Sequence, residues 1–376
     1  PPPSPRAINL LMPTHLDIIA ALEEVCPLSL QETWDNSGWQ VGNPQLECTG
    51  AMLSVEATEA TVQEALEAGC NLLITHHPLL FRPLKHIGSK TYQERTVALA
   101  IKHDVAIYSA HTNADNAAKG INYYLAERLQ LQNTRALVAQ PCNLYKLSVM
   151  VPTASAPKVE RALCAAGAGR LGCYDSCSFS VEGRGHFRPL KGANPTIGSL
   201  GELEEVIETQ ISLLVEPHLV HKVIQAIYAS HPYEVPAYEL ISLATPQDKI
   251  GTGVIGELPH PISEEEFLKK VSQWSEVEHV AYSRPLGKTI SRVALCGGSG
   301  GSFLSNAIAQ HADVYLTGEG KYNDYLDAAG HLLFVTIGHH ESESVARRLF
   351  SDIISAKFPN FVLRESLYDN NPVNHL

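Results

Sequence analysis

The stretch AGCNLLITHHP, residues 68–78, indicates the fold class, because its apolar run stops abruptly at two histidines. The stretch QHADVYLTGEG, residues 310–320, repeats this pattern near the other end of the chain. A second matched pair consists of HDVAIYSAHTNAD, residues 103–115, and GHLLFVTIGHHESE, residues 330–343. Short, continuous apolar runs of this kind are typical of strands that are buried on both faces of a sheet. We interpret the two matched pairs as an internal duplication.

Helical patterns separate these predicted strands, which indicates an α/β fold whose mainly parallel sheet is covered on both faces. Polar residues stand at the carboxyl ends of the matched strands, where open α/β sheets place their ligands. A helix at residues 14–25 comes first, with Thr14 as its cap. The predicted strands are 51–55, 71–75, 105–109, 292–296, 313–317 and 332–337, and the predicted helices are 58–68, 91–103, 117–128, 302–310 and 322–329.

The middle of the chain has a different pattern. Its strands and helices follow the β-α-β-β-α-β order of the ferredoxin-like arrangement, and no polar cluster marks the strand ends. We therefore predict a ferredoxin-like α+β domain inserted into a duplicated α/β domain. The predicted boundaries are 12–144 for the first half of the α/β domain, 145–244 for the insert and 245–376 for the second half.

The composition is that of an ordinary globular protein, with 44% hydrophobic and 18% charged residues in a chain of 376. A formal net charge of −12 argues against sequence-independent binding to nucleic acid. The chain has no apolar run of the about 18 residues that a membrane span needs. Its beginning lacks the features of a signal peptide, and its eight cysteines include no C-x-x-C pair. These features predict a cytoplasmic protein with reduced cysteines.

His76 and His77 are adjacent at the end of a predicted strand. Side chains on consecutive extended residues point in opposite directions, so each imidazole could serve one of two neighbouring metal ions. The alternative is a pair of surface or capping histidines, in a turn that Pro78 would explain.

The next strand ends close to His111 and Asp115. His111 could be a metal ligand, or a residue that orients a ligand through a hydrogen bond. Asp115 could instead belong to a turn, or cap the helix predicted at residues 117–128.

His339, His340, Glu341 and Glu343 follow the last matched strand. If a helix runs from residue 341 to 354, His339 and Glu343 are four residues apart and can face one point. The alternative is that the two glutamates only complement the dipole of a helix start.

Glu319, in the sequence TGEG, ends the fourth matched strand. It could act as a general acid or base in the same cleft, or it could cap the following helix. The glycine-rich stretch at residues 297–301 lacks the lysine of a phosphate-binding loop, which favours a tight strand-to-helix turn.

Taken together, three strand ends carry the mixture of imidazole and carboxylate that binds Zn, Fe, Mn, Co or Ni. The absence of cysteine ligands argues against a closed structural zinc site. We predict two divalent ions about 4 Å apart, as in other two-metal sites. Because histidine binds metal only when neutral and titrates near ~6.5 when free, we expect metal to be lost below about pH 6.

Five motifs occur in order: WDNSGWQVG at 34–42, ITHHPLLFRPLKHI at 74–87, YSAHTNAD at 108–115, TGEGKYND at 317–324 and IGHHESES at 337–344. They closely resemble those of the NIF-three-like family, whose members are also known as GTP cyclohydrolase 1 type 2 homologs. The resemblance covers about residues 12–370. The middle segment, including SHPYEVPAYELISL at 230–243, is similar to the insert of the longer bacterial members, which is itself similar to CutA and P-II signalling proteins.

The resemblance implies a ring-shaped hexamer whose metal sites face an inner cavity. In many relatives a histidine follows the tyrosine of the TGEGKYND motif, whereas this chain has Asn323 there, so proton transfer by that histidine would have no counterpart here. The resemblance also implies a dinuclear metal site with His111 close by and with ligands that match His76, His77, Asp115, His339 and Glu343.

Two hypotheses of function follow. The first is a metal-dependent hydrolase that acts on a nucleotide or a phosphoester, with Glu319 and His111 as candidate catalytic residues. The second is a non-catalytic metal-binding scaffold or regulatory protein, whose insert senses a small molecule or caps the ring. An activity screen of the metal-loaded protein separates the two.

Overall fold

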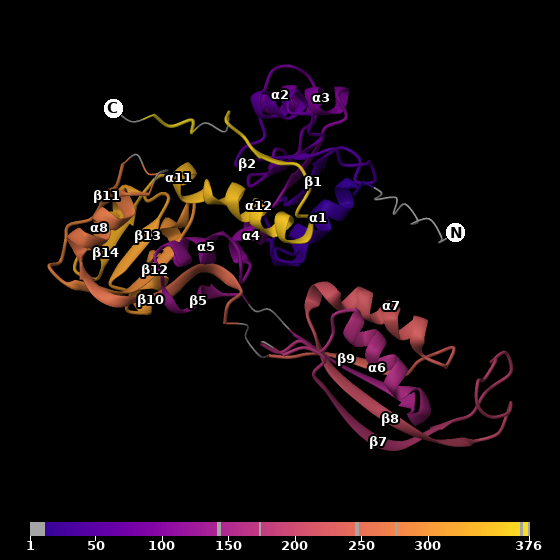
Figure 1. The fold of residues 1–376 in the computed structure, drawn as a ribbon. Coiled ribbons are helices and arrows are strands. Elements are labelled where there is room, and N and C mark those ends of the chain that lie inside the picture. The colour runs from indigo at the N-terminus through magenta and orange to yellow at the C-terminus, as the bar shows by residue number, and fades with distance from the viewer. Residues whose placement is uncertain are drawn as a thin grey trace, which may run out of the picture. The chain divides into compact units, whose positions relative to one another are not determined.

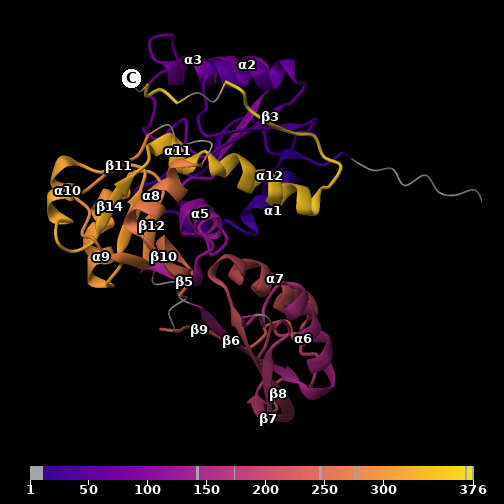
Figure 2. The same ribbon diagram turned by 60° about the vertical axis from the view of Figure 1, so that its left-hand side comes forward.

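The chain divides into two compact units in the computed structural model (Figures 1 and 2). The first unit consists of Pro1–Gln140 with Asp248–Leu376, and the second is Pro141–Gln247. Each unit contains both helices and sheets, which confirms the predicted mixed α/β class. The described residues are 12–140, 144–172, 174–244, 248–274, 277, 279–368 and 371–374.

The first sheet of the larger unit has the strand order β1-β4-β3-β2-β15. Its three central strands, β2 (Ala51–Ser54), β3 (Leu72–Thr75) and β4 (Ala106–Ser109), are parallel and buried along their whole length. These are the continuous apolar runs of the sequence. The edge strand β1 (Gly38–Val41) is antiparallel to β4, and β15 (Leu363–Glu365) is parallel to β2 at the other edge.

Helices flank this sheet. Residues of α2 (Glu59–Glu67) and α3 (Tyr92–Lys102) form a hydrophobic core with β2, β3 and β4. The helix α1 (His15–Glu23) begins as predicted, because Thr14 and Asp17 exchange the hydrogen bonds of a capping box. The long helix α12 (Val345–Lys357) contacts α1, β2 and β15.

The second sheet of the same unit has the order β11-β14-β13-β12-β10-β5. Three parallel strands again stand beside one antiparallel edge strand, so β12, β13, β14 and β11 correspond to β2, β3, β4 and β1. In spatial order the strands are β11 (Ala281–Tyr282), β14 (Leu333–Thr336), β13 (Val314–Thr317), β12 (Thr289–Cys296), β10 (Gly251–Ser263) and β5 (Gln132–Ala139).

Shorter helices and turns connect the strands of the second sheet. A 3-10 turn, η4 (Gly300–Phe303), leads into α9 (Leu304–Ala309), where the sequence predicts a single helix. The helix α10 (Tyr322–Asp327) follows β13, and α8 (Glu264–Ser272) follows β10. The 3-10 turn η1 (Leu28–Leu30) lies early in the chain, between α1 and β1.

Two predicted helices differ in the structure. The segment predicted as one helix over 117–128 follows a short helix, α4 (Thr112–Asn116), and becomes helical only at α5 (Ile121–Arg128), because Ala117 is extended. Asp115 therefore lies in a helix and not in a loop. The helix predicted to begin at residue 341 begins two residues earlier as α11 (His339–Glu343), and Ser344 separates it from α12.

Five strands of the larger unit were not predicted, namely β1, β5, β10, β11 and β15. The first of these, β1, lies in a stretch that the sequence marks as a loop. The strand β15 comes from the end of the chain but joins the first sheet, whereas β5 comes from the first half and joins the second sheet. These pairings connect residues far apart in the sequence, so no local pattern indicates them.

The smaller unit has one antiparallel sheet with the order β7-β8-β6-β9. Its elements follow the β-α-β-β-α-β order expected for this segment, apart from two 3-10 turns, η2 (Thr153–Ser155) and η3 (Pro217–Leu219). Both helices contribute to a single hydrophobic core with the sheet. The elements are β6 (Tyr145–Pro152), α6 (Ala156–Ala165), β7 (Ser178–Phe187), β8 (Glu204–Val215), α7 (Val220–Ser230) and β9 (Tyr238–Ser242).

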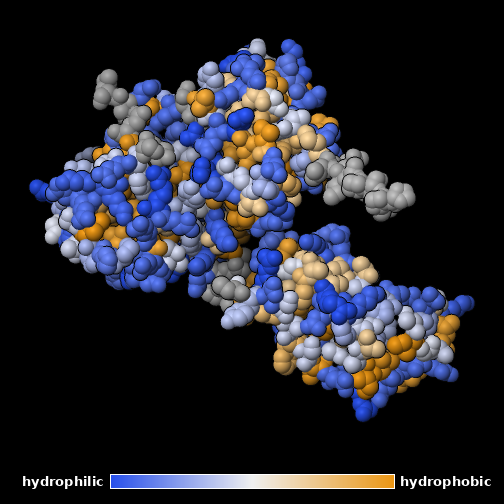
Figure 3. All heavy atoms as spheres, viewed as in Figure 1, coloured by the Kyte–Doolittle hydropathy of each residue, from blue (hydrophilic) through white to orange (hydrophobic). Residues whose placement is uncertain are grey.

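The surface mixes hydrophilic residues with smaller hydrophobic patches (Figure 3). Within the described part of the chain, no helix has the length and apolar character needed to cross a membrane. Six cysteines lie in this part, and all six are free thiols. Cys142, Cys173 and residues 1–11 lie outside the described residues.

Candidate metal centre

The six candidate ligands come from strand ends of both sheets. His76 and His77 directly follow β3, and His111 and Asp115 follow β4 in the same sheet. The second sheet contributes the first turn of α11, after β14. The structure brings all six into one cluster within the larger unit. They are His76, His77, His111, Asp115, His339 and Glu343.

Glu343 lies at the centre of this cluster, and its side chain is only 5% exposed. Its Oε2 atom is 2.9 Å from Nε2 of His77 and 3.0 Å from Nε2 of His339. Its other oxygen, Oε1, is 3.5 Å from Nε2 of His76. The two carboxylate oxygens thus face different histidines.

Among the buried polar atoms of the described cluster that lack a hydrogen bond, two belong to His76 and Asp115. They are Nε2 of His76, whose side chain is completely buried, and Oδ1 of Asp115, and they lie 3.8 Å apart. Burying such atoms without a partner costs about 1–3 kcal/mol each. A cation between imidazole and carboxylate would satisfy both atoms, so the residues fit a divalent metal ion.

Each histidine of the cluster directs Nδ1 to a group outside the ligand set. His76 Nδ1 is 2.9 Å from the carbonyl oxygen of Ala110, and His77 Nδ1 is 2.6 Å from Glu56. In the same way Asp35 lies 2.7 Å from Nδ1 of His111, and Glu319 lies 3.3 Å from Nδ1 of His339. Metal-bound histidines are held in this manner, because the outer partner sets the tautomer and leaves Nε2 free for the metal.

A profile of the family described as Duf34/NIF3 (NGG1p interacting factor 3) matches residues 13–372. The chain belongs to the Duf34/NIF3 family. This confirms the resemblance that the five motifs indicate. Two relatives named "GTP cyclohydrolase 1 type 2 homolog" support the assignment. The Bacillus subtilis protein is 36% identical, covering 96% of this chain and 98% of its own length, and the Halalkalibacterium halodurans protein is 35% identical, covering 95% of both.

Solved structures of Duf34/NIF3 relatives extend the comparison. The crystal structure of a Bacillus cereus protein related to NIF3 is 34% identical, with a TM-score of 0.85 over 97% of this chain and 100% of the other. A Staphylococcus aureus protein is 25% identical, with a TM-score of 0.74 over 97% of this chain and 99% of the other. The whole architecture of this Duf34/NIF3 protein is therefore shared with relatives.

The electrostatics of the cluster centre on Glu343. Burial alone would raise its pKa, but the surrounding histidines hold the pKa of Glu343 well below its ordinary value. Burial lowers the pKa of His77, yet hydrogen bonds with Glu343 and Glu56 outweigh it and raise the pKa to about 11. Glu343 likewise raises the pKa of His339 to about 9, against the effect of burial. The carboxylates thus favour positive charge on the histidines of the cluster.

Glu319 does not cap the following helix. That helix, α10, begins after Lys321, whose backbone N–H donates to Asp324 at 2.6 Å. Glu319 instead accepts a hydrogen bond from Ser299 and faces His339. Burial raises its pKa, but these two neighbours lower it below the ordinary value. The lowered pKa of Glu319 favours its ionised form.

The glycine-rich stretch at residues 297–301 makes room for the cluster. Gly298 has a φ of +60°, and a Cβ atom there would collide with the carboxylate of Glu343. Its N–H donates to Ser342, and the N–H groups of Gly297 and Gly300 also donate to side chains of the protein. These donors are already used, in agreement with a tight turn and not with a phosphate-binding loop.

Two functional residues were missed by the sequence analysis, Glu56 and Asp35. Glu56 lies just after β2, the third parallel strand of the first sheet, so the strand-end rule applied to every strand would have found it. Asp35 lies in the WDNSGWQVG motif, and its carboxylate also accepts hydrogen bonds from Thr112 and Ser37. Burial raises the pKa of Asp35, but these bonds and His111 lower it far below its ordinary value.

An open cavity of about 670 Å³ borders the cluster on the side of the second sheet. Ser299, Glu319 and Gly338 line it, together with Lys321 and Asp324. Asn323 is exposed at the start of α10. The cavity gives a small substrate access to Glu319.

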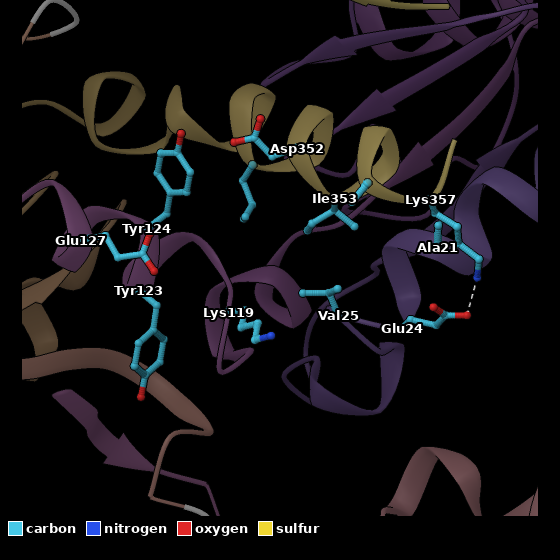
Figure 4. Close-up of a pocket in the computed structure, with 12 residues that line it drawn as sticks. Ala21, Glu24, Val25, Lys119, Tyr123, Tyr124, Glu127, Asp352, Ile353 and Lys357 are labelled. Atoms are coloured by element: carbon cyan, nitrogen blue, oxygen red, sulfur yellow. Dashed lines mark hydrogen bonds and ion pairs between the residues drawn. The ribbon is translucent and has the colours of Figure 1, made fainter. Parts of the chain in front are cut away.

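A second groove of about 710 Å³ lies elsewhere, between α1, α5 and α12 (Figure 4). Lys119, Tyr123 and Tyr124 line it, and an ion pair between Lys357 and Glu24 closes one end. No residue of the histidine cluster lines this groove. Its size therefore does not mark it as the reactive site.

Proposed function

We propose that this protein is a metal-dependent hydrolase whose centre binds two divalent ions. One observation carries the proposal: Nε2 of His76, His77 and His339 converges on the buried carboxylate of Glu343, while each Nδ1 is held by an outer partner. The unpartnered atoms of His76 and Asp115 support it, because a cation satisfies both.

The number of ions is proposed from the arrangement of the ligand groups. One set of close ligand atoms comprises His76, His77 and His111, and another comprises His77, His339 and Glu343. Glu343 faces His76 with one oxygen and the other two histidines with the second oxygen. Glu343 would then be a ligand of both ions. Imidazole with carboxylate suits Zn, Fe, Mn, Co or Ni.

The chemistry divides between the metal and the protein. Divalent ions supply a nucleophile at neutral pH and polarise the substrate. Glu319 is an ionised carboxylate with a side chain that is 55% exposed at the cavity, so it is placed to accept a proton. His111 is held by Asp35 beside His76 and can position the substrate or bind metal. The names of the relatives suggest GTP as substrate, and a phosphoester is compatible with the same site.

The test is turnover by metal-loaded protein, assayed with GTP and with p-nitrophenyl phosphate. We expect hydrolysis of at least one of them, and we expect Asp115→Asn to lower the rate by about 100-fold or more, because it removes a charged ligand. The control is Asp175→Asn, which lies in the smaller unit outside the cluster. Full metal occupancy without turnover of either compound would favour a metal-binding scaffold, and equal rates for the Asp115 variant would contradict the proposed role of the cluster.

We also propose that residues 145–244 are an inserted, CutA- or P-II-like domain, and that the protein assembles as a hexamer. The β-α-β-β-α-β order of the smaller unit supports the insertion. The ends of the larger unit lie side by side, because Ala139 of β5 pairs with Gly251 of β10 and the N–H of Gln140 donates to Ile250 at 3.0 Å.

Replacing residues 141–247 by a short glycine-containing turn is therefore expected to leave a folded remainder that binds the same amount of metal. Circular dichroism and metal analysis of this variant are the measurements. Sedimentation velocity of the full-length protein tests the hexamer. An unfolded remainder, or a full-length protein that sediments as a monomer, would each contradict the corresponding part of the proposal.

A further inference from the structure

Two exposed aromatic side chains stand beside the metal cluster. Trp34 is 60% exposed and Phe81 is 46% exposed. Their ring centroids are 6.1 Å apart, and each lies 6.3 Å from the imidazole of His111. All three pairs are edge-to-face, with interplanar angles of 69°, 76° and 87°. None of the three pairs is stacked.

Hydrogen bonds that organise the cluster also hold this aromatic pair. Asp35, next to Trp34, accepts bonds from His111 and from the N–H of Thr112. The next residue, Asn36, donates from Nδ2 to the carbonyl oxygen of Leu80 at 2.9 Å, which connects the loop of Trp34 to the loop of Phe81. The loop of Trp34 is therefore connected both to His111 and to the loop of Phe81.

Such exposure needs a physical explanation. Large aromatic side chains gain free energy when they are buried, and an exposed apolar group beside a cleft is characteristic of a ligand site. Trp34 and Phe81 lie in loops next to the candidate metal ligand His111. A ligand that covers them there would be planar enough to lie on an aromatic face and small enough to reach the cluster.

The charge next to the aromatic pair indicates what the planar group carries. Arg82 and Lys85 follow Phe81 in the same exposed loop, within a chain whose net charge is −12. Neither forms an ion pair with any residue of the described chain. Two unpaired cations beside exposed rings complement an anionic molecule that contains an aromatic ring.

We propose that Trp34 and Phe81 bind the planar heterocycle of the substrate, and that Arg82 and Lys85 bind its anionic group. The substrate class is thus a heteroaromatic ring that carries phosphate, as in a nucleotide. This inference rests on the proposed function, since it assumes that the neighbouring cluster is the reactive site. It assigns specificity to residues outside the metal ligands. Stacking on such side chains accepts any base, so the site would recognise the ring and its charge more than a particular base.

Isothermal titration calorimetry of the full-length protein with three probes tests the proposal. GMP carries ring and phosphate, guanosine carries the ring alone, and ribose 5-phosphate carries the phosphate alone. We expect GMP to bind more tightly than either fragment. Trp34→Ala is expected to weaken GMP binding by about tenfold or more and to leave ribose 5-phosphate unchanged, because only stacking is lost.

Further variants complete the design. Trp34→Leu keeps an apolar side chain without the ring, and should weaken GMP binding like Trp34→Ala. Arg82→Gln combined with Lys85→Gln should weaken GMP and ribose 5-phosphate but not guanosine. Tyr368→Ala removes a similarly exposed aromatic residue, 57% exposed after β15, and should change nothing. Metal content is measured for each variant and should equal that of the unchanged protein.

The outcomes separate this inference from the proposed function. Equal GMP affinity in the unchanged protein and in both Trp34 variants would overturn the inference, as would no binding of GMP at millimolar concentration. A change of oligomeric mass in Trp34→Ala with unaltered GMP binding would also overturn it, in favour of a contact between copies. If metal-loaded protein binds GMP through Trp34 yet hydrolyses no nucleotide, the proposed function fails and the inference stands.

Discussion

The Glu343→Gln variant is expected to lose its bound metal while keeping its fold. Glu343 is a candidate ligand, and its two oxygens face three histidines of the cluster. Glutamine has the same shape but no charge, and its amide nitrogen would direct hydrogens toward imidazoles or metal. We expect metal affinity to fall by at least about 100-fold, more than the loss caused by removing an outer partner.

Metal content after dialysis, measured by inductively coupled plasma mass spectrometry, checks this expectation. The matched control is Glu341→Gln, two residues earlier in α11, where the buried carboxylate accepts a hydrogen bond from Asn371 and not from the cluster. The control should retain its metal. If Glu343→Gln bound metal as tightly as the unchanged protein, Glu343 would not be a ligand, and its position would reflect only ion pairs with histidine.

Metal affinity is also expected to fall steeply as the pH is lowered from about 9. The pKa of free histidine alone would predict metal loss only below about pH 6. Neighbouring carboxylates raise the pKa of His77 to about 11 and that of His339 to about 9. Raised values mean that these imidazoles hold protons at neutral pH after metal is removed. A metal ion binds neutral imidazole, so it must displace these protons. For each displaced proton, the apparent metal affinity falls about tenfold when the pH is lowered by one unit.

The stability of the metal-free protein is expected to depend on pH in the opposite direction from metal affinity. Its protonated histidines stabilise the fold below the ordinary histidine pKa, and this contribution is lost as the pH rises through about 9 and then about 11. Competition with a chelator between pH 6 and pH 9 measures the first effect, and thermal unfolding of the stripped protein measures the second. An affinity that stays constant from pH 9 to pH 7 would contradict the expected proton displacement.

The strand-end residues show how much of the centre was predictable. A buried parallel strand needs a continuous apolar run, and the chain must turn where the run stops, so polar residues there lie at one edge of the sheet. This local rule identified His76, His77 and His111. The same rule, applied to the matched strand of the second sheet, identified His339. Glu56 obeys the same rule, but it follows the strand at 51–55, which is not one of the four matched strands to which the rule was applied.

Asp35 shows where local reasoning stops. Its loop contains no chemical signal beyond one carboxylate, and its partner His111 is 76 residues away in the sequence. The two meet because β1, which follows the loop, pairs with β4, which precedes His111. Only this antiparallel pairing makes a loop aspartate into the group that orients a candidate ligand.

The sequence by itself determined the repeated α/β pattern, the different character of residues 145–244 and the residue types of the centre, because burial and chain reversal act over a few residues. Only the tertiary structure decided that Glu343 lies close to histidines that follow strands of the first sheet, and that Glu319 faces His339. It also decided that β5, from the first half of the chain, joins the second sheet, and that β15, from the second half, joins the first sheet. These facts depend on contacts between distant segments. Such contacts are set by how whole faces pack together, and a local pattern contains no information about which distant face will be its partner.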